Sequence, residues 1–309
     1  MVGYDKEQRE SGYEQIIDPA TGSVAWQVER ATGEVYENRS INVPVGTVFI
    51  TPEQQRIRTG KAKHSYKRRS KNPKFYFAST ETEAGLIDLA PVTVTRLVYL
   101  AAFLPYGKSR LMETERTAIK RRDLPRILDV SKATVSRFWG EVCPEYLKED
   151  TDGVILMNEA VFRRGSIQRK QFARYQKVFR DGVRALYSNT QQNHHKRLGF
   201  IFQLLPYLNT EFNIVCRQED VEETDLEKVN LLSVAEFCSL IGYDVIHIKE
   251  LVSDLNSITF VVNGRRERFC SFAYDGIDRP GARIFVNPHI LYAGSDRKKV
   301  EVLGAFCRC

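Results

Sequence analysis

The side chains best suited to chemistry in this sequence are cations and small polar groups that can bind bases. In residues 131–142, large apolar residues recur at helical spacing and predict a buried stripe. The opposite face presents Lys132, Ala133, Ser136 and Arg137. Arg can bond guanine through two donors, Ser can serve several bases, and Ala leaves room for a thymine methyl group. This pattern predicts a helix that reads base edges in a major groove, against the plain alternative of a solvated polar face.

A second set of cations is suited to phosphate. Nine Lys or Arg fall within residues 56–74, and residues 54–80 contain no acid. Such a run repels itself unless a polyanion neutralises it, so it predicts either a phosphate-tracking arm or a solvated linker. The predicted phosphate-binding residues are Lys67, Arg68, Arg69, Lys71, Lys120, Arg121, Arg122 and Arg126.

Catalytic patterns are weak by comparison. The His-x-x-Arg of His194 and Arg197 occurs in tyrosine recombinases, but the distal Arg and spaced Tyr nucleophile are not recognisable. Residues 219–227 hold six acids, which fits a solvated loop better than a metal site, and the six cysteines show no C-x-x-C spacing. No phosphate-cradling G-x-x-x-x-G-K-[ST] is present. We therefore expect no enzyme, no metal and no cofactor, and we expect mostly buried free thiols.

The base-reading helix needs a framework to hold it. Pro91 suits the first turn of a helix that continues with buried spacing to Leu104. Residues 124–128 predict a short helix, and Ser131 is a natural N-cap after a tight turn. Asp152-Gly153 then marks a hairpin tip. Helix, helix-turn-helix and hairpin in this order predict a winged helix.

The same order occurs twice. "RLVYLAAFLPYG" (96–107) returns as "RLGFIFQLLPYLN" (197–209), and "MNEAVFRRGS" (157–166) aligns without a gap to "VNPHILYAGS" (286–295). Between these landmarks, Ile248, Leu251 and Val252 stand where the first unit has its buried Val, Phe and Trp. Three landmarks in one order predict a tandem duplication.

The second unit differs in its exposed residues. Its reading helix would expose Val245, Ile246, Lys249 and Glu250 with His247 at the edge, which are poor base readers. We therefore expect this unit to bind DNA more loosely or to serve as a partner surface. Its predicted DNA contacts are His247, Lys249, Arg265, Arg266, Arg268, Arg279 and Arg283, whereas the first hairpin is acidic.

We expect an α+β fold, mostly helical, built from tandem winged helix-turn-helix repeats with a small N-terminal β-element. Residues 1–55 form that β-hairpin element and residues 56–85 a basic arm or linker. Residues 86–166 form the first winged helix and residues 196–309 the second. A basic connecting helix occupies residues 167–195.

The hydrophobic content is typical of a globular protein, and the positive net charge favours binding to a polyanion. The 309 residues are 42% hydrophobic and 28% charged, with a formal charge of +7 and a pI near 9.0. The N-terminus lacks a signal-peptide core, no window is apolar enough to span a bilayer, and the terminal Cys307 and Cys309 miss the prenylation box. We expect a cytoplasmic protein without membrane contact, either a monomer with an internal pseudo-repeat or a homodimer.

A resemblance to a known family lies in "DVSKATVSRFWGEV" and "GVILMNEAVFRRGS". These segments resemble the winged-helix core of RepL-type plasmid replication proteins of Gram-positive bacteria, and the second half is similar to helix-turn-helix proteins of phages and plasmids. The resemblance implies a sequence-specific double-stranded DNA-binding protein, either a replication initiator or a transcriptional regulator, which meets host replication or transcription proteins. The alternative is an adaptor whose second winged helix and acidic loop recruit a host protein.

Overall fold

The computed structural model describes residues 13–17, 24–29, 35–37, 74–81, 85–167, 175–262, 264–273, 281–292 and 297–309. The chain divides into two compact units, Met1–Lys71 and Asn72–Cys309. In the first unit, three antiparallel strands lie where the sequence predicts a small β-element. They are β1 (Tyr13–Ile17), β2 (Val24–Glu29) and β3 (Val35–Glu37), in the order β1-β2-β3.

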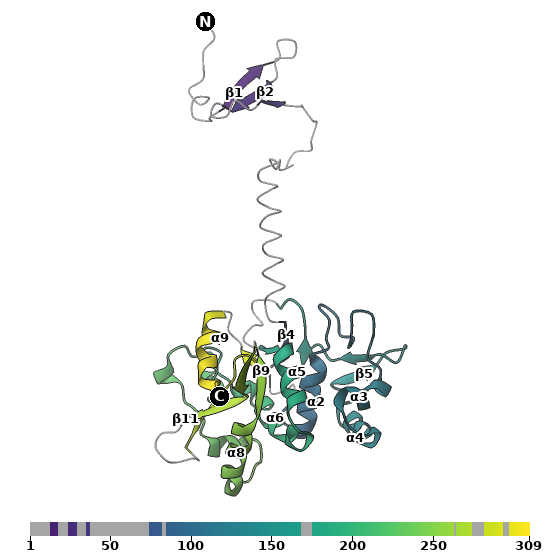
Figure 1. The fold of residues 1–309 in the computed structure, drawn as a ribbon, viewed down its shortest axis with the longest axis vertical. Helices are drawn as coiled ribbons and strands as arrows, with labels where there is room; N and C mark the ends of the chain where they lie inside the picture. The colour runs from purple at the N-terminus through teal and green to yellow at the C-terminus, as the bar shows by residue number, and fades with distance from the viewer. Residues whose placement is uncertain are drawn as a thin grey trace. The chain divides into compact units, whose positions relative to one another are not determined.

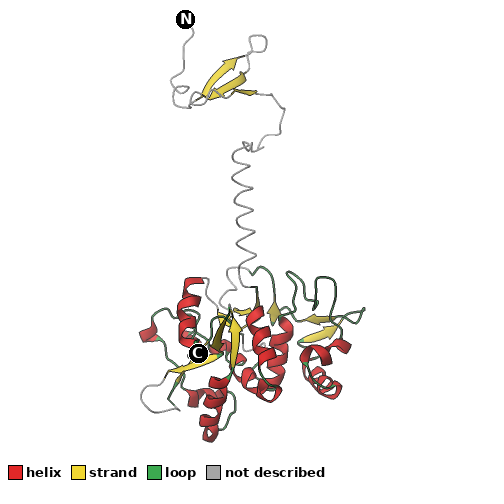
Figure 2. Cartoon of the chain, in the orientation of Figure 1, coloured by secondary structure: helices red, strands yellow, loops and turns green. Residues whose placement is uncertain are grey.

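The larger unit is a mixed α and β structure, α+β in class, in which helices surround small antiparallel sheets (Figures 1 and 2). Its central sheet has four strands in the order β13-β8-β4-β7. They are β4 (Phe75–Ser79), β7 (Phe162–Arg163), β8 (Tyr175–Phe179) and β13 (Leu291–Tyr292). The sheet thus joins strands that are more than 200 residues apart in the sequence.

The pairing in this sheet is symmetric. Phe77 of β4 faces Lys177 of β8, and the pairs on either side of it mirror one another. On the outer edges, Phe77 pairs with Arg163 just as Lys177 pairs with Tyr292. Because paired antiparallel strands are related by a two-fold axis perpendicular to the sheet, this register places a local two-fold axis between Phe77 and Lys177.

Each half of the unit has its own series of elements. The first half holds α2 (Pro91–Ala101), η3 (Arg121–Asp123), α3 (Leu124–Leu128), α4 (Lys132–Val142), β5 (Leu147–Glu149) and β6 (Ile155–Met157). The second half begins with α5 (Arg180–Asn189), η5 (Gln192–His194), α6 (His195–Phe202), η6 (Leu205–Tyr207), η7 (Gln218–Asp220) and η8 (Leu226–Lys228).

The second half continues with α7 (Val234–Leu240), η9 (Val245–His247), α8 (Ile248–Ser257), β9 (Thr259–Val262), β10 (Arg265–Arg268), β11 (Cys270–Ala273) and β12 (Arg283–Val286). After β13 come α9 (Arg297–Gly304) and η10 (Ala305–Cys307). Pro91 occupies the first turn of α2, as predicted, where its missing N–H costs no hydrogen bond.

Equivalent residues of the two halves make equivalent hydrogen bonds. The backbone N–H of Asn158 donates to the carbonyl of Tyr146, and its side-chain Nδ2 donates to the carbonyl of the residue before that. The backbone N–H of Asn287 donates to the carbonyl of Phe269, and its Nδ2 again donates to the preceding carbonyl. Each Asn Oδ1 accepts the N–H two residues on. The residues that align in the sequences of these two segments thus make the same hydrogen bonds in the structure.

One continuous core joins the two halves. Helices α2 and α6 pack against each other, and residues of both belong to a single buried cluster that reaches the sheet through Tyr76 and Val178. Thr95 of α2 donates its hydroxyl to the carbonyl of His195, which begins α6. Among the described residues, no helix is long and apolar enough to cross a membrane.

Two predictions about the connecting segments are corrected. The helix expected within residues 167–195 begins only at Arg180, because Tyr175–Phe179 forms strand β8 with Gln176 and Val178 facing the core. Similarly, the end of the basic segment 56–85 is not a linker, because Phe75–Ser79 forms β4, one of the two central strands of the sheet. Residues 56–73, with Lys67, Arg68, Arg69 and Lys71, lie outside the described residues.

Candidate nucleic-acid interface

Helices α3 and α4 form a tight helix-turn-helix pair. Leu124, Ile127 and Leu128 of α3 are buried, and Asp129 ends that helix in the left-handed conformation with φ of 52°. The N–H of Val130 then returns to the carbonyl of Pro125, which reverses the chain. The Ser131 hydroxyl accepts the N–H of Thr134 and caps α4, as predicted.

Helix α4 presents the predicted residues to solvent. Its stripe of Val135, Phe138, Trp139 and Val142 is buried, and each of these side chains is at most 7% exposed. Lys132, Ala133, Ser136 and Arg137 are exposed on the other side. Within the described part of the chain, neither Lys132 nor Arg137 forms an ion pair, so both charges are available to a ligand.

The four predicted phosphate-binding cations before α4 differ in availability. The Arg126 guanidinium forms two hydrogen bonds with the Glu113 carboxylate, 2.8 and 2.7 Å long, and this contact lowers the Glu113 pKa. Lys120 Nζ donates to the Asp152 carbonyl, and Arg121 stacks over the Trp139 ring. Arg122 is exposed with no ion pair among the described residues.

The acidic hairpin between β5 and β6 is partly neutralised by a residue that the sequence analysis did not identify. Arg110 bonds to Asp150 through Nε at 2.8 Å and to Asp152 through Nη2 at 2.8 Å. Arg110 lies 40 residues before Asp150, so no local spacing indicated the pair. With this partner, the hairpin tip carries less negative charge than its sequence implies.

The turn between α7 and η9 repeats the turn between α3 and α4. Gly242 has a φ of +64° at the position of Asp129, and the N–H of Tyr243 bonds to the carbonyl of Cys238 as that of Val130 does to Pro125. The Asp244 carboxylate caps the next helix by accepting the N–H of Ile246, as predicted. The first three residues form 3-10 helix η9 before α8 begins at Ile248.

The exposed face of this second helix is partly apolar. Val245 is 50% exposed and Ile246 is 82% exposed, while Lys249 and Glu250 also face solvent. Nδ1 of His247 lies 3.5 Å from Oε2 of Glu250. The residues predicted to be poor base readers are therefore the ones that the structure exposes.

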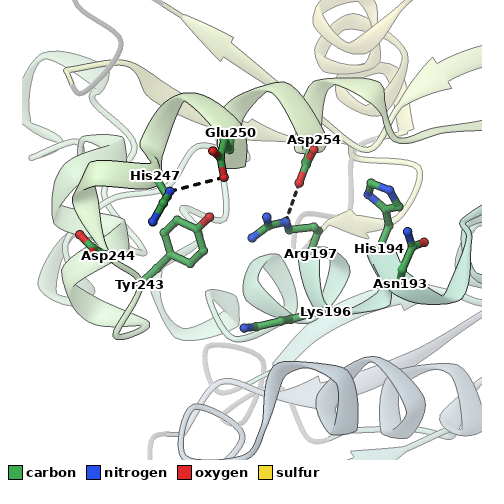
Figure 3. Close-up of a pocket in the computed structure, with 9 residues that line it drawn as sticks. All are labelled: Asn193, His194, Lys196, Arg197, Tyr243, Asp244, His247, Glu250 and Asp254. Carbon is green, nitrogen blue, oxygen red and sulfur yellow. Dashed lines mark hydrogen bonds and ion pairs between the residues drawn. The ribbon is translucent and has the colours of Figure 1, made fainter.

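A pocket of 420 Å³ lies beside this helix, between α6 and α8 (Figure 3). Arg197 of α6 bonds to Asp254 of α8 at 2.8 Å and stacks over the Tyr243 ring at 5.3 Å. His194 and Lys196 also line the pocket. Arg197, the arginine of the His-x-x-Arg pattern, thus forms an ion pair that joins α6 to α8.

The second hairpin carries two of the predicted cations on its surface. Arg265 and Arg266 on β10 are exposed, whereas Arg268 and Arg283 are partly buried. Between them Glu267 is 3% exposed and accepts hydrogen bonds from Asn287 and from the His289 ring. Arg279, the remaining predicted contact, lies outside the described residues.

Buried titratable groups in this region have structural partners. His195 is 2% exposed, and its Nε2 lies 3.0 Å from the Thr190 carbonyl and 3.2 Å from that of Tyr187. Burial lowers the pKa of His195, so the neutral ring with a donating Nε2 is favoured. Four cysteines, Cys216, Cys238, Cys270 and Cys307, are buried free thiols, and burial raises the pKa of each.

Comparisons with known proteins identify no relative: no family model, no curated protein and no solved structure matches the chain.

Proposed function

We propose that the protein is a sequence-specific double-stranded DNA-binding protein built from two winged helix-turn-helix units, with α4 and α8 as the reading helices. The observation that carries this proposal is the capped, exposed helix α4, which offers Lys132, Ser136 and Arg137 to a ligand while its other face is buried. A helix of this kind after a tight turn is the element that enters a major groove.

The local two-fold axis supports the same function. Proteins that read DNA with helix-turn-helix pairs commonly present two of them, related by two-fold symmetry, to successive grooves on one side of the duplex. Here the axis lies within one chain, and α4 and α8 both lie at the lower end of the larger unit in Figure 1. One chain therefore supplies both reading helices, which fits a monomer. A homodimer would supply four reading helices and bind a DNA site of twice the length.

The two units would differ in their contacts with the backbone. On the first unit, exposed Arg122 is available to phosphate, and Lys120 and Arg126 reach it only by exchanging their present partners. On the second unit, Arg265 and Arg266 are exposed at the hairpin. Phosphate contacts fix register, and base contacts carry the specificity.

The biological setting follows from the resemblance to RepL-type and phage or plasmid helix-turn-helix proteins. We infer a cytoplasmic protein of a mobile element that acts as replication initiator or as transcriptional regulator, without a catalytic step or cofactor. Both roles require the same first event, binding to a defined site, and both then bring host replication or transcription proteins to it.

The test is selection of bound DNA from a random duplex library by the full chain. Wild-type protein should enrich one recurring site, and Lys132→Ala with Arg137→Ala should lose that enrichment while retaining salt-sensitive binding to random duplex. Val302→Ala, an exposed change on α9, serves as the matched control. Absence of any enriched site with folded wild-type protein would overturn the proposal.

A further inference from the structure

The first turns of the second reading helix expose two large aliphatic side chains. Ile246 is 82% exposed and Val245 is 50% exposed, although comparable residues of α8, such as Ile248 and Leu251, are at most 4% exposed. Neighbouring apolar side chains held in water are unfavourable unless a partner covers them. A partner that offers an apolar group to the start of this helix would remove these two side chains from water.

The matched hydrogen bonds show which residues of the first unit correspond to these two. Val130 aligns with Tyr243 through the same backbone turn, and Ser131 aligns with Asp244 because each caps the helix that follows. Continuing along the helix, Val245 takes the position of Lys132 and Ile246 that of Ala133. The aliphatic pair thus occupies the positions from which α4 is proposed to read bases.

Major-groove base edges offer one apolar group, the C5-methyl of thymine. The other groups on those edges are hydrogen-bond donors and acceptors that an aliphatic side chain cannot satisfy. Positive charge for a duplex lying against α8 is available from Lys249, exposed on the same helix, and from Lys196, which lines the pocket beside it. A DNA surface therefore fits the apolar pair, with Lys249 and Lys196 as the neighbouring cations.

We propose that Val245 and Ile246 contact thymine methyl groups in the half of the DNA site that α8 occupies. This inference rests on the proposed function, and it makes the full site asymmetric. The half bound by α4 contains guanine, which Arg137 contacts through two donors, and the half bound by α8 is selected by its thymine methyl groups. The two units then read different sequences although the same turn precedes both helices.

The experiment replaces thymine by deoxyuridine, which removes only the methyl group and keeps base pairing. On the site enriched by the wild-type chain, this replacement in the α8 half should weaken binding about fourfold for each contacted methyl. Ile246→Ala should lose a similar factor on thymine DNA and little more on deoxyuridine DNA. Deoxyuridine in the α4 half should weaken wild type and Ile246→Ala by equal factors.

The control is Val302→Ala, which shortens another exposed β-branched side chain, 65% exposed, on α9. It should bind both DNAs as wild type does. If a site is enriched and Arg137→Ala weakens it, but deoxyuridine in the α8 half changes nothing, the methyl contact is wrong while the proposed function stands. The methyl contact is also wrong if Ile246→Ala loses the same affinity on thymine DNA and on deoxyuridine DNA. It is wrong as well if Ile246→Ala leaves DNA binding unchanged and only releases a protein that copurifies with the wild-type chain. No enriched site at all would remove the proposed function itself.

Discussion

Gly199 of α6 lies directly against Pro91 of α2, so closely that a Cβ at residue 199 would stand 1.8 Å from the Pro91 carbonyl oxygen. The contact falls where the two halves of the larger unit meet, beside the hydrogen bond from Thr95 to the His195 carbonyl. Only glycine permits this approach between the two helices.

We expect Gly199→Ala to lower the free energy of unfolding by ~1–3 kcal/mol or more, because the helices must separate to admit the methyl group. Gly140→Ala is the control, since Gly140 is also helical but a Cβ added there would meet no atom within 4 Å. That change should be neutral or stabilise by up to ~1 kcal/mol. Denaturant melts of both variants measure the difference, and similar values for the two would show that α2 and α6 do not meet closely.

The repeated turn provides a second stability prediction. Gly242 and Asp129 hold the same left-handed position, with φ of 64° and 52°. Gly242→Ala should therefore destabilise by ~1 kcal/mol, whereas Asp129→Gly should be neutral or slightly stabilising, because a side chain strains this conformation and glycine does not. Thermal melts in one buffer compare the two. A destabilising Asp129→Gly would mean that the two turns differ.

Buried His195 makes stability depend on pH. Its folded pKa is lowered by burial, so below the unfolded value of ~6.5 the unfolded state binds a proton that the folded state does not. This contribution is present above pH ~6.5 and is lost progressively as the pH falls toward the folded pKa. His195→Gln keeps a side-chain donor for the Thr190 carbonyl and should flatten the fall in stability as the pH drops below neutral in urea titrations. If the free energy of unfolding falls equally with pH in His195→Gln and wild type, His195 does not cause the pH dependence.

The reading role of Arg137 predicts a loss of specificity. Arg137→Ala should weaken the enriched site by ~1–3 kcal/mol and leave binding to random duplex nearly unchanged. Arg122→Ala removes an exposed cation before α3 and should weaken binding to the enriched site and to random duplex by the same factor. The slope of log affinity against log salt concentration should fall by about the contribution of one phosphate contact. Fluorescence anisotropy at several salt concentrations separates these effects. Equal losses for Arg137→Ala on both duplexes would assign Arg137 to phosphate.

Much of the fold could be predicted from the sequence. The N-caps Ser131 and Asp244, the α4 helix and its buried stripe all lie where spacing and capping chemistry place them, because these signals are local. The sequence pattern of strand β8 is misleading for a physical reason. Tyr175, Val178 and Phe179 sit three and four residues apart, which mimics a helical stripe, and helix α5 begins directly afterwards.

The features that the sequence did not predict depend on distant partners. The symmetric pairing of β4 with β8 joins residues about 100 positions apart, and no local period announces it. The same holds for Arg110 with Asp150 and for Arg197 with Asp254, whose partners lie 40 and 57 residues away. At the candidate site, the sequence predicted which residues are exposed on α4. It did not predict that Lys120 and Arg126 form hydrogen bonds with other residues of the chain.

The most direct test of the account is a hydroxyl-radical footprint of the full chain on its enriched site, with the number of chains per duplex measured on the same sample. We predict one chain on an asymmetric site, with two protected segments on one side of the duplex about one helical turn apart. Arg137→Ala should weaken protection of one segment first, and Ile246→Ala that of the other. A single protected segment that responds equally to both variants, or no recurring site, would contradict the account.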